Sequence, residues 1–184
     1  GRVLWLLFLM ISATFTGLVI NGFEGQLSTF LYSFTPLLMG TAGNCGSQAS
    51  TTVIRALALD QISTKDFFKV SMKEGLISLI CSSVLAVANA VRVILMYWWT
   101  AYNINYLVLK VSLVLAIALI LIIFIAQVLG SLLPIIAKKI HVDPALMSAP
   151  VISTIMDTLS ILIYCAVIVV CAIWFGWNLR VVPA

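Results

Sequence analysis

Residues 106–137 read YLVLKVSLVLAIALILIIFIAQVLGSLLPIIA, an apolar stretch with a single charged side chain, Lys110. A helix that crosses a bilayer needs roughly 20 mostly apolar residues, so this stretch is long enough to span a membrane. Of the 184 residues, 63% are hydrophobic and only 9% are charged. A soluble protein of this composition would expose large aggregation-prone patches. The chain is therefore predicted to be an all-α integral membrane protein.

The other apolar segments resemble the first in length. The five segments cover residues 3–20, 27–59, 74–99, 106–137 and 144–177, and short polar turns separate them. They leave no long polar stretch for a soluble domain, so residues 1–184 are predicted to form one transmembrane pore domain of about five helices. Because the sequence begins with glycine rather than methionine, we expect it to be part of a longer protein.

The distribution of lysine and arginine predicts the orientation of the helices, because cytoplasmic loops are enriched in both. If the N-terminus is cytoplasmic, the inner side holds Arg2, Arg55, Lys65, Lys69, Lys73, Lys138 and Lys139. The outer side then holds only Arg92, Lys110 and Arg180, and an odd number of spans places the C-terminus outside. We expect a multi-pass protein of the cell inner or plasma membrane. The basic residues form no dense cluster, so the net charge of +4 does not indicate nucleic-acid binding.

One acidic residue, Asp157, lies deep in an apolar segment, and no Lys or Arg lies three or four residues from it. Buried ionisable groups in membranes are rare, and they usually serve a function. The helical spacing places on one face Ser153, Asp157, Ser160 and Tyr164, with Thr154 and Thr158 flanking this stripe. The stripe either lines a water-filled permeation path or forms hydrogen bonds between helices with Asp157 protonated.

A matching polar surface lies in the second segment. Its small and polar residues recur at helical spacing, and the candidate pore-lining positions are Gly40, Gly43, Asn44, Ser47, Gln48 and Thr51. Small residues allow helices to approach closely, and they expose backbone carbonyls that hold a cation or its hydration water. Plain helix packing is the alternative interpretation. Asn44 and Gln48 add hydrogen-bonding capacity that packing does not require.

The residue types favour a hard divalent cation. A two-fold homodimer would place two copies of Asp157 near its axis, and Mg²⁺ keeps most of its waters while using one or two carboxylates. Softer metals would favour Cys or His. We expect His141 to be a loop residue and the cysteines to be buried and unpaired, namely Cys45, Cys81, Cys165 and Cys171. The sequence does not separate Mg²⁺ from Mn²⁺, Co²⁺ or Ni²⁺.

These residues resemble two signatures of MgtE-type magnesium channels. PLLMGTAGNCGSQAS at residues 36–50, followed by IRALA at residues 54–58, is similar to the second-helix signature of that family. The last-helix signature is similar to the stretch that begins with DPA at residues 143–145, continues to Asp157 and ends with LIY at residues 162–164. The two motifs occur in the family's order, and the resemblance covers essentially the whole chain.

The resemblance implies a homodimer in a lipid bilayer with a pore between the subunits, lined mainly by the second and fifth helices. It also implies that Asp157 faces the pore and binds hydrated Mg²⁺, and that Asn44 matches a pore-side asparagine. Ala42 departs from the family, which usually has glycine there. Bacterial members also carry cytoplasmic N-terminal and CBS regulatory domains, and we expect these in a full-length protein outside the present residues.

The resulting hypothesis is a passive magnesium channel or transporter rather than an enzyme. The main alternative is a proton-coupled divalent cation exchanger in which Asp157 alternates between proton and metal. An intramembrane aspartyl enzyme would need two catalytic carboxylates, and the sequence has no G-x-S-x-G or H-E-x-x-H motif. A structural membrane anchor would leave the polar stripe unexplained.

Overall fold

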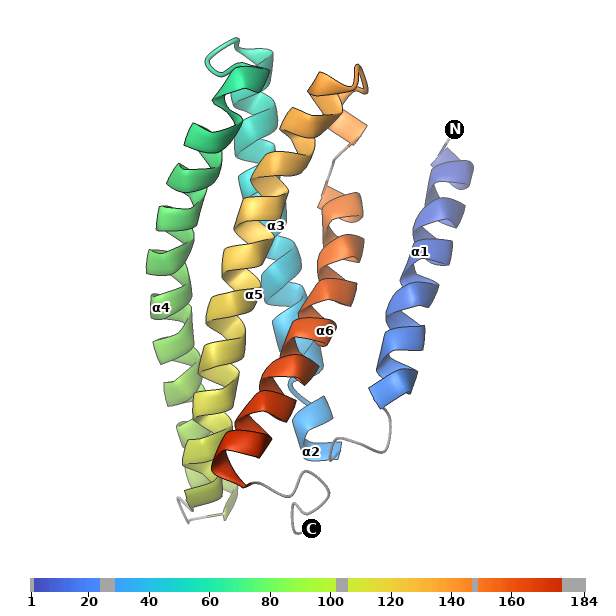
Figure 1. The fold of residues 1–184 in the computed structure, drawn as a ribbon. Helices are drawn as coiled ribbons and strands as arrows, with labels where there is room; N and C mark the ends of the chain where they lie inside the picture. Colours follow the sequence, from blue (N-terminus) through green and yellow to red (C-terminus); the bar gives the residue numbers. More distant parts are fainter. Residues whose placement is uncertain (1, 24–28, 102–105, 147–148, 177–184) are drawn as a thin grey trace.

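The structure of the protein is a computed structural model that describes residues 2–23, 29–101, 106–146 and 149–176. Within these ranges its regular secondary structure is all helical, and turns connect the helices. Five long helices run roughly side by side, and short helical turns join some of them (Figure 1). In chain order the elements are α1 (Arg2–Phe23), α2 (Thr29–Tyr32), α3 (Thr35–Ala58), η1 (Thr64–Asp66), α4 (Phe67–Ala101), α5 (Tyr106–Lys139), η2 (Pro144–Leu146) and α6 (Ala149–Phe175). The predicted all-α fold class is confirmed.

The second apolar segment contains two helices. α2 ends at Tyr32 and α3 begins at Thr35, where the Thr35 hydroxyl donates to the Tyr32 carbonyl. Pro36 falls in the first turn of α3, where its missing N–H costs nothing because first-turn amides have no partner inside the helix. The glycine-rich part that follows is one uninterrupted helix, so the polar residues there do not break the span.

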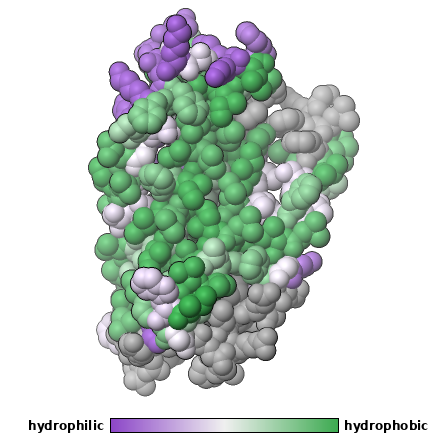
Figure 2. Space-filling model, in the orientation of Figure 1, coloured by the Kyte–Doolittle hydropathy of each residue, from purple (hydrophilic) through white to green (hydrophobic). Residues whose placement is uncertain are grey.

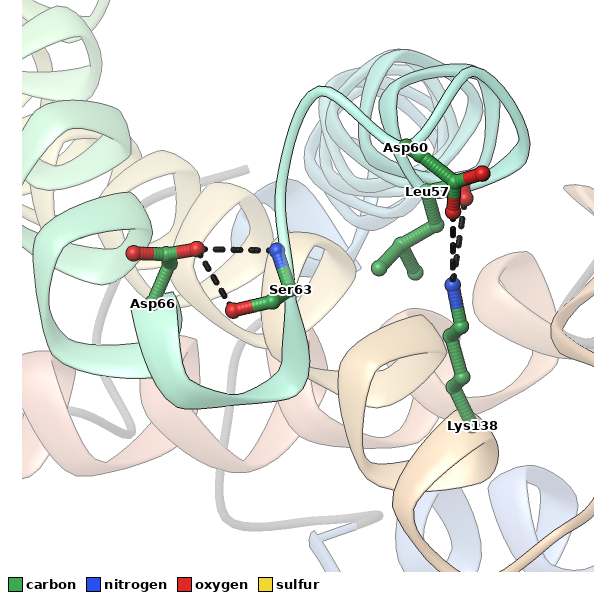
Figure 3. Close-up of polar contacts among 5 residues, drawn as sticks. All are labelled: Leu57, Asp60, Ser63, Asp66 and Lys138. Carbon is green, nitrogen blue, oxygen red and sulfur yellow. Dashed lines mark hydrogen bonds and ion pairs between the residues drawn. The ribbon is translucent and has the colours of Figure 1, made fainter.

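α4 begins earlier than the sequence predicts. The expected segment starts at residue 74, whereas the helix starts at Phe67 and includes Lys69 and Lys73, which precede the expected segment. The Asp66 carboxylate accepts hydrogen bonds from the Ser63 amide and hydroxyl, each at 2.8 Å (Figure 3). These bonds fix the turn that starts the helix, so α4 extends beyond its apolar part.

The loop between α3 and α4 is attached to the end of α5 by one lysine. Lys138 Nζ donates to the Leu57 carbonyl at 3.1 Å and lies 3.9 Å from the Asp60 carboxylate (Figure 3). Asp60 is 93% exposed, so its ion pair adds little to stability. The bond to Leu57 matters more, because a cation there binds a carbonyl of the last turn of α3.

The surface and the helix lengths fit a bilayer. Figure 2 shows apolar side chains over most of the visible face and hydrophilic ones gathered at the end that holds the α3–α4 loop. Among the described residues, three segments are long and apolar enough to cross a membrane, Thr64–Trp98, Val108–Lys139 and Pro150–Phe175, and Leu9–Phe23 is a shorter apolar helix. α3 has 24 residues, which is long enough to span, but its polar residues lower its hydropathy.

The core lies where α3 packs against α5 and α6, while α4 covers α5 and α1 packs against α6 (Figure 1). Glycines bring these helices into backbone contact. A Cβ atom at Gly130 of α5 would overlap the Gly46 carbonyl of α3, and a Cβ at Gly46 would lie 2.8 Å from Ile152 Cγ2 of α6. Only residues without a side chain allow this approach, which fixes α3 between its two neighbours.

Replacing Gly130 with alanine is expected to destabilise the protein by about 1–3 kcal/mol, because the new methyl group forces two backbones apart. Thermal unfolding of the purified protein in detergent measures this change. Gly75→Ala is the matched control, since its Cβ would lie 3.4 Å from the Phe124 ring, an ordinary contact. The control should be neutral or slightly stabilising, because alanine favours helix. Equal melting temperatures for Gly130→Ala and the parent would contradict this packing.

Candidate functional site

One face of α3 is polar and uncovered. Its residues line an open cavity of about 520 Å³, and they are Asn44, Ser47, Gln48, Thr51 and Thr52. This face lies away from the contacts that Gly46 makes with α5 and α6, because packed and open positions alternate at helical spacing. The structure thus brings four of the predicted pore-lining residues together and adds Thr52. Thr52 could have been found from the sequence, because it lies four residues after Gln48 and residues at this spacing share a helix face.

The hydroxyl protons of the two threonines on this face are already used within the helix. Thr51 Oγ1 donates to the Ser47 carbonyl at 2.8 Å, and Thr52 Oγ1 donates to the Gln48 carbonyl at 2.9 Å. The lone pairs of these oxygens, and the amide oxygens of Asn44 and Gln48, stay available as acceptors. Water molecules around a cation are hydrogen-bond donors, so the face has the chemistry to receive a hydrated cation.

Asp157 is half-buried on α6, at the depth where the sequence predicts a functional carboxylate. The hydroxyl of Ser160 donates to the backbone carbonyl of Asp157 at 3.1 Å and leaves its carboxylate unengaged. In the parts of the chain that the structure describes, no side chain or amide binds this carboxylate. An unpaired carboxylate at membrane depth costs several kcal/mol unless it binds a proton or a cation.

The α3 face and Asp157 belong to neighbouring helices. A Cβ atom at Gly43 would lie 3.1 Å from Ser153 Oγ, so α3 and α6 touch at these two residues. The helices run antiparallel (Figure 1). Asp157, one turn further along α6, is therefore level with Gly40, one turn earlier along α3. Gly40 is exposed, and nothing lies within 4 Å of the place its Cβ would take.

The predicted polar stripe of α6 is divided into an open half and a covered half. Ser153 and Asp157 are half-buried, whereas Ser160 is 1% exposed and Tyr164 is fully buried. The Tyr164 hydroxyl donates to the Leu31 carbonyl at 2.9 Å, which attaches α6 to α2. Ser160 as a pore-lining residue stays a prediction, and within this chain its hydroxyl is enclosed.

The flanking threonines also have partners. Thr154 Oγ1 donates to the Pro150 carbonyl at 2.8 Å, and Thr158 Oγ1 lies 2.7 Å from Thr16 Oγ1 of α1. Thr16 is buried in a mostly apolar helix, and it was not among the predicted site residues. Its hydroxyl could not be singled out in the sequence, because Ser12 and Thr14 lie in the same stretch. This bond sets α1 against the side of α6 next to Asp157.

The potential ligands for softer metals are scattered. Within the described ranges, no three side chains of His, Cys, Asp or Glu come together as a metal site. Cys165 and Cys171 are buried, Cys45 and Cys81 are half-buried, and all four are free thiols. His141 is exposed in the turn after α5, with a positive φ of 61°. Next to the open face of α3, the described residues offer the carboxylate of Asp157 and neutral oxygens as ligands for a hard cation.

Comparisons with known proteins find a matching family and several relatives. The family model described as MgtE, divalent cation transporter, matches residues 35–167. The magnesium transporter MgtE of Thermus thermophilus is 35% identical over 169 residues, covering 91% of this chain and 35% of that protein. The magnesium transporters MgtE of Bacillus subtilis and Enterococcus faecalis are 32% and 30% identical over 165 residues each. The chain thus spans about a third of the length of these curated relatives, 34–35%.

Cysteine labelling tests whether the α3 face meets water. In a background without the native cysteines, Gln48→Cys should react roughly tenfold faster with a charged thiol reagent than Ser50→Cys, because thiol reactivity follows exposure to water. Ser50 lies on the same helix and is 1% exposed, which makes it the matched control. Labelling of both positions at one rate, or only by a lipid-soluble reagent, would show that the face is dry.

Proposed function

The chain belongs to the MgtE family of divalent cation transporters, and on this premise we propose that it forms the membrane passage of a magnesium transporter. The observation that carries the proposal is the open polar face of α3. A polar helix face is not stable against hydrocarbon, because lipid offers its groups no hydrogen bonds. The face therefore needs water or protein against it.

A second copy of the chain would supply both the protein and the enclosed water that this face of α3 needs. The cavity beside Asn44 and Gln48 is lined by α3 alone, so no other described helix of the same chain covers it. Two-fold symmetry is the commonest arrangement of homo-oligomers, and it would set two such faces opposite each other. The space between them is then polar on both sides and closed off from lipid. This is the homodimeric pore of the proposal.

The two-fold arrangement would also double the number of Asp157 carboxylates at the passage. Asp157 lies level with Gly40, at the edge of the open face, so the dimer would place two carboxylates along the passage. Two negative charges balance one Mg²⁺, and the low-dielectric surroundings strengthen their attraction for it. Mg²⁺ loses its waters reluctantly. Neutral oxygens of Asn44, Ser47 and Thr51 would hold those waters while the carboxylates supply charge.

The passage belongs to a larger protein in this proposal. The relatives are about three times longer than the matched region, since it covers 34–35% of them, so cytoplasmic regulatory domains are expected elsewhere in the full-length chain. The lysine-rich end, with Lys138 and the α3–α4 loop, would face the cytoplasm of the inner or plasma membrane. Flux measurements with Mn²⁺, Co²⁺ and Ni²⁺ test whether these ions also pass through the protein.

A proton-coupled exchanger is the second candidate, and the unengaged Asp157 carboxylate favours it. A carboxylate without a partner at membrane depth takes up a proton readily when no cation is present. The two mechanisms differ in what drives transport. An imposed pH gradient drives Mg²⁺ into proteoliposomes only if protons move in exchange, whereas a passive channel responds to the Mg²⁺ gradient and the membrane potential.

Substitutions at Asp157 test the pore carboxylate. Asp157→Asn keeps the size of the side chain but removes two charges from the dimeric passage, so Mg²⁺ binding and flux should fall by roughly tenfold or more. Asp157→Glu keeps the charge and should retain part of the flux. The measurement is Mg²⁺ flux into proteoliposomes together with titration of bound Mg²⁺. Asp60→Asn is the matched control, because Asp60 lies in the α3–α4 loop and its side chain is 93% exposed.

The role of Asp157 as a pore carboxylate would be overturned if Asp157→Glu reduced the Mg²⁺ flux more than Asp157→Asn. If Asp157 were a protonated packing residue, asparagine would replace it well and glutamate, which is longer, would disturb the helix contacts. Folding of each variant is checked first by its melting temperature. An Asp157→Asn protein that transports like the parent, beside an inactive Asp157→Glu protein, is the result that excludes the proposal.

The dimer has a separate test. Native mass spectrometry of the purified chain should show two copies, and Thr51→Cys should form a cross-link between subunits, because Thr51 lies on the face that would meet its symmetry mate. Ser50→Cys, on the buried side of α3, should not cross-link. A monomer that still conducts Mg²⁺ would contradict the pore between subunits.

A further inference from the structure

Arg92 is a charged residue in the apolar part of α4. It is the first charge after Glu74, and the 17 residues between them are uncharged. Seventeen helical residues rise about 26 Å, close to the roughly 30 Å of a bilayer hydrocarbon core. Arg92 therefore lies at the edge of the core, at the end of α4 opposite the lysine-rich loop.

Arg92 does not reach out toward the water beyond that edge. Its Nε and Nη2 donate to Asn89 Oδ1 at 3.2 and 3.0 Å, so the guanidinium points one turn back along α4, away from Trp98. A lysine or arginine near a helix end usually extends toward the interface to keep its charge in water. Here the hydrogen bonds to Asn89 direct the guanidinium of Arg92 back toward the hydrocarbon core.

The pair has hydrogen-bond donors left over. Asn89 is 6% exposed, and no acceptor for its Nδ2 is found in the part of the chain that the structure describes. A guanidinium has five N–H groups, and Asn89 accepts only from Nε and Nη2 of Arg92. Among the described residues, no carboxylate forms an ion pair with Arg92. The buried amide of Asn89 lacks an acceptor, and the guanidinium of the exposed Arg92 beside it carries positive charge, so an anionic acceptor would suit both groups.

Two cavities meet at this pair. Asn89 and Arg92 line a space of about 180 Å³ that Thr41 and Leu119 close from α3 and α5. Arg92 also borders an open groove of about 640 Å³ that runs along α4 to Trp98, and the other residues lining it are Ala88, Val91, Leu95, Met96 and Trp98. A ligand here would place an anionic group on Asn89 and Arg92 and an apolar group in the groove.

We propose that Asn89 and Arg92 bind the phosphodiester of an anionic phospholipid, with an acyl chain along the groove toward Trp98. The phosphate oxygens accept from Asn89 Nδ2 and from the remaining guanidinium N–H groups, and their charge neutralises Arg92. The membrane position and the apolar groove favour a lipid over a soluble phosphate. The site lies on α4, which packs on α5, and the proposal is independent of how ions cross the membrane.

The test is lipid binding to the purified full chain, measured by native mass spectrometry. Phosphatidylglycerol should bind more tightly than phosphatidylcholine, and Arg92→Gln should weaken phosphatidylglycerol binding roughly tenfold. Lys69→Gln removes the same charge from the opposite end of α4 and should leave binding unchanged. Asn89→Asp supplies Arg92 with a carboxylate from the protein itself, so it should fold normally and lose the preference for phosphatidylglycerol.

Three results would overturn the proposal. The first is equal binding of the two lipids by the parent protein. The second is a full preference for phosphatidylglycerol in Asn89→Asp, which stays informative even if Arg92→Gln fails to fold. The third is displacement of phosphatidylglycerol by millimolar inorganic phosphate in detergent, which would make a soluble anion the ligand.

Discussion

The backbone contact between Gly46 of α3 and Gly130 of α5 is the constraint on which the rest of the structure depends. With Gly43 against Ser153, it holds α3 between α5 and α6 at a distance that no side chain would allow. The contact also fixes the rotation of α3, because a shift of one residue turns a helix by about 100°. Asn44 and Gln48 therefore face outward, on the side that α5 and α6 leave open.

That rotation leaves one polar face of α3 uncovered by the other described helices. The residues that bury α3 and the residues of its open face come from one short sequence, and small side chains serve both purposes. The proposed role of Asp157 follows from its position next to α3. This residue lies level with Gly40, one turn before the open face, while Ser160 and Tyr164 of the same stripe are buried and Tyr164 donates to Leu31. The proposed pore is lined by the open parts of α3 and α6 from each of two subunits related by two-fold symmetry.

Sequence reasoning found the membrane class, the five long helices and the polar positions of α3, because hydropathy and helical periodicity are local properties. It misplaced the start of α4, since the Ser63–Asp66 turn lets the helix run past the membrane edge. It also treated the α6 stripe as uniform. Which half is covered depends on α2, and the contact of Thr158 with Thr16 depends on α1, both distant in sequence. Periodicity identifies a face of a helix, and only tertiary packing shows what covers it.

In the proposed passage, Mg²⁺ crosses with its water shell, held by charge and by neutral oxygens. Competition by cobalt hexaammine tests it most directly, because this inert cation matches hydrated Mg²⁺ in shape and cannot shed its ligands. Mg²⁺ flux through the purified protein in proteoliposomes should fall as the complex is added, and the inhibition should be relieved by more Mg²⁺. Flux that is unaffected by the complex would show that the site binds a bare ion, and it would contradict the account.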